Sequence, residues 1–104
     1  MMELNVSKRT MMRLIREHKD QIGVPIPQPN CKEVRFTEEE NGDYTVAWED
    51  EYSRYRFALG PDLILRAYIT EKCQIHATYI GLDRDWLTGL GILPEREEGL
   101  VCQG

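Results

Sequence analysis

Three stretches between residues 34 and 59 alternate apolar and polar side chains with a period of two. Because successive side chains of a β-strand point to opposite faces, this alternation predicts three short strands, each with one apolar face. The segments between them are short and polar, so we expect an antiparallel meander around which the rest of the chain packs. The apolar positions are Val34 and Phe36, then Tyr44, Val46 and Trp48, then Tyr55, Phe57 and Leu59.

The first turn contains Asn41-Gly42, and its length decides how the strands pair. A two-residue loop would place Phe36 opposite Ala47 and split the apolar residues between both faces of the sheet. A three-residue loop, 40–42, with Gly42 left-handed in a bulge keeps them on one face, and we expect that register. With a four-residue loop at 50–53, it pairs Val34 with Trp48, Phe36 with Val46, Trp48 with Tyr55, Val46 with Phe57 and Tyr44 with Leu59.

Residues 7–22 have helical rather than strand periodicity. Ser7 is a favourable N-cap, and Gly23 is suited to end the helix in the left-handed conformation. The three prolines of segment 24–30 favour an extended connector from this helix to the meander. The apolar stripe of the helix follows a spacing of three and four residues and consists of Met11, Leu14, Ile15, His18 and Ile22.

The segment after the meander, 62–70, could begin a helix, but its Ile, Tyr and Thr content favours a strand. We expect Glu71-Lys72 to form a tight turn into a further strand, 73–80. In this hairpin Tyr68 lies opposite Ile75.

The length of 104 residues suits a single domain, 1–104, and the predicted elements place it in the α+β class. An N-terminal amphipathic helix is expected to pack on an antiparallel β-meander of three to five strands, followed by a short C-terminal helix, 84–90, capped by Asp83 and ended by Gly91. The expected parts are a basic helix, 1–23, a Pro-rich connector, 24–30, the sheet with the short helix, 31–94, and a flexible tail, 95–104.

Charge is unevenly distributed along the chain, whose formal net charge is −5. Residues 1–23 contain five Lys or Arg, whereas residues 33–51 contain eight Asp or Glu and one base, Arg35. No apolar run approaches the length of a membrane span, and the start of the chain lacks the features of a signal peptide. Together with only three cysteines, this predicts a cytoplasmic protein.

The segment Leu4–Glu17, with its sequence LNVSKRTMMRLIRE, resembles the turn and recognition helix of MerR- and excisionase-type helix-turn-helix proteins. The segment Val34–Glu40, VRFTEEE, is similar to the strand and acidic turn of the wing in MerR-like domains. The resemblance covers about a fifth of the chain and lacks the first helix of the motif. It implies a DNA-binding protein in which the nucleic-acid-binding residues are Lys8, Arg9, Arg13 and Arg16.

Catalysis and metal binding are not expected. A zinc site could draw on Cys31, Cys73, His76 and Cys102, but their spacing argues against one, because Cys73 and His76 would point to opposite faces of a strand. No Ser or Cys lies in a recognised nucleophile motif, and no glycine-rich loop opens a helix to hold phosphate. We therefore expect a protein that is not an enzyme and has no cofactor.

The acidic residues of the meander offer a different function. The turns at 38–43 and 49–51 lie at opposite ends of the middle strand, separated by roughly 20 Å. Two carboxylate clusters at this spacing could imitate phosphates and occupy the basic groove of a nuclease or another nucleic-acid-binding protein, as phage-type inhibitors do. The partner-binding residues would be Glu38, Glu39, Glu40, Asp43, Glu49, Asp50 and Glu51.

The sequence therefore favours a small, non-enzymatic intracellular protein that acts on nucleic-acid machinery by binding a basic partner protein. DNA binding through the basic helix is the first alternative. The second is an interaction domain without any link to nucleic acids, in which the acidic turns serve solubility and protect the sheet edges.

Overall fold

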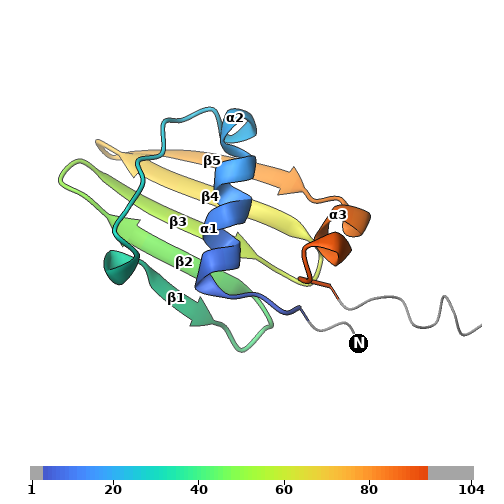
Figure 1. Ribbon diagram of the computed structural model, residues 1–104. Helices are drawn as coiled ribbons and strands as arrows, with labels where there is room; N and C mark the ends of the chain where they lie inside the picture. Colours follow the sequence, from blue (N-terminus) through green and yellow to red (C-terminus); the bar gives the residue numbers. More distant parts are fainter. Residues whose placement is uncertain (1–3, 94–104) are drawn as a thin grey trace, which may run out of the picture.

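The structure, a computed structural model, describes residues 4–93. Five antiparallel strands form one sheet in chain order, and helix α1 crosses the strands on one side of it (Figure 1). The strands are β1 (Arg35–Glu38), β2 (Tyr44–Glu49), β3 (Ser53–Leu59), β4 (Ile64–Glu71) and β5 (Gln74–Gly81). The helices are α1 (Lys8–Glu17), α2 (Lys19–Ile22), the 3-10 turn η1 (Cys31–Glu33) and α3 (Arg84–Gly89). The predicted α+β architecture is confirmed, whereas the expected tail, 95–104, lies outside the described residues.

The predicted register of the meander is confirmed. Phe36 pairs with Val46, Val46 with Phe57, Trp48 with Tyr55 and Tyr44 with Leu59. In the first turn the Glu39 N–H donates to the Asp43 carbonyl at 2.7 Å, and Gly42 has a φ of 94°, as the three-residue bulged loop requires. Val34 precedes the described β1–β2 ladder, and its side chain is buried in the core.

The β4–β5 hairpin corrects one prediction. The strand predicted at 62–70 is present as β4, although the turn that follows it is Lys72-Cys73 rather than Glu71-Lys72. Tyr68 therefore lies opposite Ala77 instead of Ile75. Lys72 and Cys73 both have positive φ, 51° and 68°, which is the geometry of a type I′ turn. The shift exchanges cross-strand partners but leaves each side chain on its expected face.

The predicted helix 7–22 is interrupted at His18, where φ is −113° and ψ is 15°. The His18 ring forms a hydrogen bond of 2.8 Å between Nδ1 and the Leu14 carbonyl, and it meets Trp86 edge-on with 5.2 Å between the ring centroids. The His18 N–H also reaches the carbonyls of Leu14 and Ile15, both at 3.2 Å, so α1 ends at His18 and α2 begins separately at Lys19. Both predicted ends are confirmed, since Ser7 Oγ accepts a hydrogen bond from the Thr10 N–H and Gly23 is left-handed with a φ of 77°.

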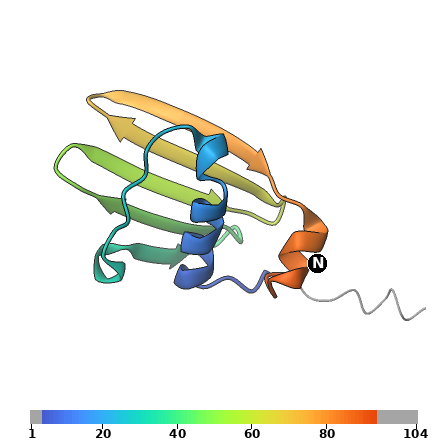
Figure 2. The same cartoon turned by 45° about the horizontal axis from the view of Figure 1, so that its top comes forward.

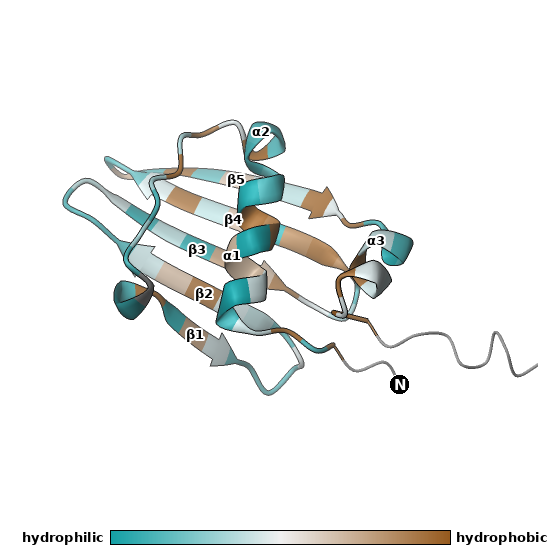
Figure 3. Ribbon diagram, in the orientation of Figure 1, coloured by the Kyte–Doolittle hydropathy of each residue, from teal (hydrophilic) through white to brown (hydrophobic). Residues whose placement is uncertain are grey.

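The core lies between α1 and the inner face of the sheet. Met11, Leu14 and Ile15 of α1 are almost fully buried, as are Phe57 and Leu65 of the central strands. The segment 24–30 runs over the same side of the sheet as α1 (Figure 2). Hydrophobic and hydrophilic residues alternate along the strands (Figure 3), so each strand gives one set of side chains to the core and the other to the opposite face.

Helix α3 closes one end of the fold. Asp83 caps it by accepting a hydrogen bond from the Trp86 N–H, as predicted, although the helix ends at Gly89 rather than at Leu90. The Asn5 N–H donates to the Ile92 carbonyl at 2.7 Å, which ties the segment before α1 to the segment after α3. Across residues 4–93, we find no helix that is both long and apolar enough to cross a membrane.

Candidate functional site: the open face of the sheet

All helices of the described chain lie on the inner face of the sheet or at its end (Figures 1 and 2). The opposite side, which we call the open face, carries every second side chain of each strand. These residues are Arg35 and Thr37, Thr45, Ala47 and Glu49, Arg54, Arg56 and Ala58, Ile64, Arg66, Tyr68 and Thr70, and Ile75, Ala77 and Tyr79.

Strand pairing arranges these side chains in rows that run across the sheet. One row consists of Arg35, Ala47, Arg56, Tyr68 and Ala77, one residue from each strand. Since neighbouring strands lie about 4.8 Å apart, the Cα atoms of Arg35 and Arg56 are separated by roughly 10 Å. Tyr68 is the direct cross-strand neighbour of Arg56. Ala47 lies between the two arginines, and its small side chain leaves room between theirs. The next row consists of Thr37, Thr45, Ala58, Arg66 and Tyr79.

The open face is positively charged although the chain as a whole is acidic. Arg66 is committed to Asp62 at 2.6 Å, and this hydrogen bond lowers the pKa of Asp62 and raises that of the guanidinium. Arg54 lies 3.8 Å from Glu49, a pair too exposed to hold either side chain firmly. Arg35 and Arg56 form no ion pair with any described residue, so their charge is available to a ligand.

Aromatic and apolar side chains accompany these arginines. Tyr68 and Tyr79 meet edge to face with 6.1 Å between their ring centroids. A hydrogen bond with Tyr79, aided by partial burial, raises the pKa of the Tyr68 phenol. Tyr79 and Ile75 are exposed by 63% and 67%, unusually much for large apolar residues in a strand. A groove runs along these residues, and its lining also includes Trp48 and Tyr55 of β2 and β3. The lining residues on the open face are Arg35, Ala47, Glu49, Arg54, Arg56, Tyr68, Thr70 and Ile75.

The acidic residues predicted to bind a partner lie at opposite ends of β2, in the two turns and in the strand ends next to them, since Glu38 is the last residue of β1 and Glu49 the last of β2. Four of the seven have a side-chain or backbone partner among the described residues. Glu39 accepts a hydrogen bond from Thr45, Asp43 from the Asn41 amide, and Glu49 faces Arg54. Asp50 accepts hydrogen bonds from the Tyr52 and Ser53 N–H groups and from the Tyr55 hydroxyl.

The other three acids, Glu38, Glu40 and Glu51, are exposed and form no side-chain hydrogen bond or ion pair within residues 4–93. The structure therefore leaves one or two available carboxylates at each end of β2. The two acidic turns are not brought together into one cluster.

The basic residues of α1 are distributed over its outward side. Arg9, Arg13 and Arg16 are exposed, while Lys8 is half-buried. The opposite side of the helix packs on the sheet. The segment that resembles a wing, Val34–Glu40, forms the edge strand β1 and the turn that follows it.

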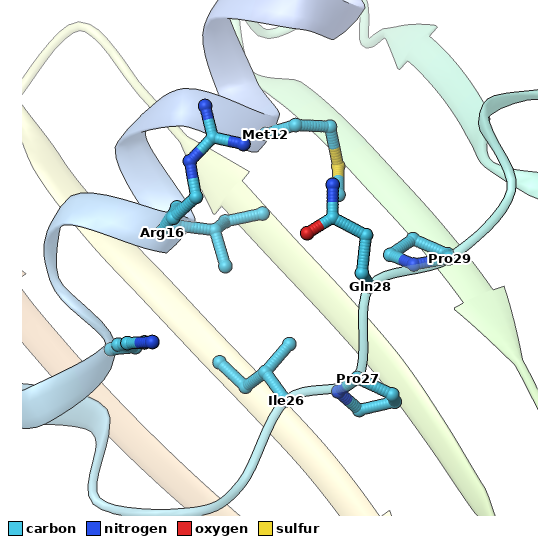
Figure 4. A pocket seen from close by; sticks show the side chains of 8 residues that line it. Met12, Arg16, Ile26, Pro27, Gln28 and Pro29 are labelled. Carbon is cyan, nitrogen blue, oxygen red and sulfur yellow. The ribbon is translucent and has the colours of Figure 1, made fainter.

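A small pocket lies between α1 and the connector (Figure 4). Its volume is about 90 Å³, well below the several hundred Å³ of ordinary small-molecule sites. Met12, Ile26 and the prolines give it apolar walls, and Arg16 extends along its rim. It accommodates only a few atoms.

Of the four zinc ligands considered from the sequence, the structure describes the side chains of Cys73 and His76, whereas that of Cys31 lies outside the described part. No group of three or more His, Cys, Asp or Glu side chains within the described part is close enough to hold a metal ion. Cys73 lies in the β4–β5 turn, and His76 of β5 is 3.7 Å from Glu71. Cys102 lies outside the described residues.

Comparisons with protein-family models, with curated proteins and with solved structures find no match for this chain. The function therefore has to be inferred from the geometry of the molecule itself. Sequence reasoning missed the open face because it followed only the apolar positions of the meander. The signal was present in the alternate positions, where Arg54 and Arg56 stand between the apolar residues of β3.

Proposed function

We propose that the protein is a non-enzymatic binding protein whose open face binds single-stranded nucleic acid. The observation that carries this proposal is the row in which Arg35, Arg56 and Tyr68 share one face of the sheet, with both arginines free of ion pairs among the described residues. Guanidinium groups bind phosphates by forked hydrogen bonds, and a tyrosine ring offers a surface for base stacking. The broad face of a sheet can hold a single nucleic-acid strand whose bases are splayed out. A sheet of five strands is too wide to enter the groove of a duplex as a helix does.

The charge distribution favours binding of the nucleic-acid strand to the open face over binding to the ends of the sheet. Acidic residues gather in the turns at both ends of β2 and repel phosphate there. Contacts from Arg35, Arg54 and Arg56 would release counterions. For single strands we expect the logarithm of affinity to fall with the logarithm of salt concentration with a slope of about −2, or about −0.7 for each contact.

The test uses fluorescence anisotropy with a labelled fifteen-nucleotide oligothymidylate at low salt. The double variant Arg35→Ala/Arg56→Ala should weaken binding about tenfold or more, because two charge-assisted contacts are lost. The matched control is Arg9→Ala/Arg13→Ala, which removes the same charge from the opposite side of the molecule and should bind like wild type. Absence of binding by wild type, or equal losses in both double variants, would refute the proposal.

A second pair of variants separates stacking from charge. Tyr68→Leu should weaken oligothymidylate binding, since stacking of a base on an aromatic ring is worth about 1–3 kcal/mol. Tyr52→Leu is the control, because Tyr52 is 76% exposed in the β2–β3 turn, away from the row of arginines. If both variants bound like wild type, the open face would act by charge alone.

Binding of a basic partner protein through the acidic turns is a second candidate function. It is supported by the three carboxylates without a structural role, Glu38, Glu40 and Glu51, at opposite ends of β2. Glu40→Lys/Glu51→Lys is the informative variant, because it spares the turn-forming Asp50. It should slow association with a basic partner recovered from the host, and unchanged association would reject this function.

DNA binding by α1 remains the alternative implied by the helix-turn-helix resemblance. It is supported by the exposed Arg9, Arg13 and Arg16 on the outward side of the helix. The control variant Arg9→Ala/Arg13→Ala tests it directly, with a labelled duplex as the probe. Loss of duplex binding in that variant alone would assign the function to α1.

A further inference from the structure

The two edges of the sheet differ in how they are protected. Strand β1 has four residues, of which the last is Glu38, is preceded by Glu33, and follows a connector rich in proline. Short length, charge and proline are the devices by which proteins prevent an edge from pairing with another strand. Strand β5 has eight residues, with no Lys, Arg, Asp, Glu or Pro among them. It pairs with β4 without a bulge, so its outer edge presents an uninterrupted set of backbone donors and acceptors.

The exposed side chains of β5 are arranged so that the strand complements itself. Ile75 and Tyr79 lie on the open face on either side of Ala77 and at equal distance from it. If two copies of β5 pair antiparallel about a twofold axis at Ala77, each Ile75 meets the Tyr79 of the other copy. Such aromatic–aliphatic cross-strand pairs stabilise a sheet. On the inner side the same register places His76 opposite Thr78, so no like charges face each other.

Shifts of this register lose the complementarity. A twofold axis at Thr78 would place Ile75 opposite Gly81, and an axis at His76 would place Tyr79 opposite Cys73. Only the axis at Ala77 covers both exposed apolar side chains. A peptide of unrelated sequence could form the same backbone hydrogen bonds with β5. It would lack the side chains that pair with Ile75 and Tyr79.

We propose that the β5 edge binds a second copy of this chain and forms a symmetric dimer with a continuous ten-stranded sheet. An antiparallel pair about this twofold axis is isologous, because the same residues contribute from both subunits. The axis runs perpendicular to the sheet, so both open faces lie on the same side. The dimer is independent of the proposed nucleic-acid binding. It would, however, place two open faces side by side for one bound nucleic-acid strand.

The first test measures mass in solution. Sedimentation velocity of the full chain at increasing concentration should show a monomer–dimer equilibrium. Ala77→Lys places two like charges directly opposite each other at the axis and should shift the protein to monomer, with the circular dichroism spectrum of wild type because Ala77 is exposed in the single chain. The matched control, Thr37→Lys, puts the same charge on the open face at the β1 edge and should leave the dimer intact.

The second test reads the register. In a background with Cys31→Ser, Cys73→Ser and Cys102→Ser, the variant Ala77→Cys should form an intermolecular disulfide on mild oxidation, because directly opposed residues of an antiparallel pair have Cα atoms close enough for one. Thr37→Cys in the same background should remain uncrosslinked. A wild type that is monomeric at every concentration would overturn the proposal, as would an Ala77→Lys variant that dimerises normally. A dimer that Ala77→Cys fails to crosslink would place the interface elsewhere and overturn it too.

Discussion

The indole of Trp48 stacks on the ring of Tyr55, its direct partner on the neighbouring strand, with 5.0 Å between the ring centroids and an angle of 18° between the planes. Phe57, two residues further along β3, also stacks on Trp48, with 5.4 Å between the ring centroids. Both neighbours are almost completely buried, as is Trp48 itself, at 3% exposure. These three rings occupy the inner face of the β2–β3 pair, so the packing of that pair depends on Trp48.

Trp48→Ala should therefore lower the free energy of unfolding by about 3–5 kcal/mol, because it opens a large cavity in the core. Trp48→Phe should cost clearly less, since it keeps most of the stack and removes an indole N–H that has no hydrogen-bond partner in the described structure. Urea unfolding followed by circular dichroism measures both. Tyr52→Ala, at an aromatic residue exposed by 76%, is the control and should stay within about 0.5 kcal/mol of wild type. Equal stabilities for Trp48→Ala and wild type would contradict the described packing.

Asp50 predicts a pH dependence of stability. Hydrogen bonds from the Tyr52 and Ser53 N–H groups lower the pKa of its carboxyl group below the ordinary value of 3.8. Because the folded-state pKa lies below the unfolded one, the stabilisation is complete above the unfolded value and is lost as pH falls through the folded-state pKa. Asp50→Ala should thus melt at a lower temperature than wild type at about pH 7, and the difference should shrink towards about pH 2. Glu51→Ala, next in the same turn, is the control and should match wild type throughout.

Gly60 is restricted by its neighbour Asp43 rather than by its backbone angles. A Cβ atom at position 60 would lie 2.5 Å from Asp43 Oδ1, closer than such atoms approach. Gly60→Ala should therefore destabilise the fold by about 1–3 kcal/mol, as overpacking does. The same substitution should cost less in an Asp43→Ala background, where the obstructing carboxylate is gone. Gly89→Ala, whose added methyl group meets nothing within 4 Å, serves as the control. Additive losses in the double variant would show that Asp43 is not the obstacle.

The sequence was sufficient for the meander because its register depends on two local features. Apolar alternation marked the buried face, and Gly42 selected the length of the first turn. The β4–β5 hairpin lacked such a marker, because its left-handed turn residues are Lys72 and Cys73 rather than Asn or Gly. The break in the first helix was equally hidden, since His18 fits the apolar stripe and the departure of its backbone from helical angles leaves no trace in the periodicity.

The candidate site was less predictable than the fold. A function on the acidic turns was suggested by net charge along the chain, which ignores what each carboxylate does locally. Asp50, for example, was expected to bind a partner, but its carboxylate accepts hydrogen bonds from the Tyr52 and Ser53 N–H groups and so forms part of the turn. The open face became visible only when strand pairing placed Arg35, Arg56 and Tyr68 in one row, because these residues are widely separated in sequence.

The order of elements along the chain has a consequence during synthesis. Helix α1 has ten residues, too few to be stable alone in water, and it leaves the ribosome before any of the strands that cover its apolar side. The strands, by contrast, pair with their immediate neighbours in sequence and can join one after another. The side chains of Met11, Leu14 and Ile15 therefore remain open to chaperones, or to aggregation, until the central strands have emerged. Although α1 is translated before the strands, its stability depends on them.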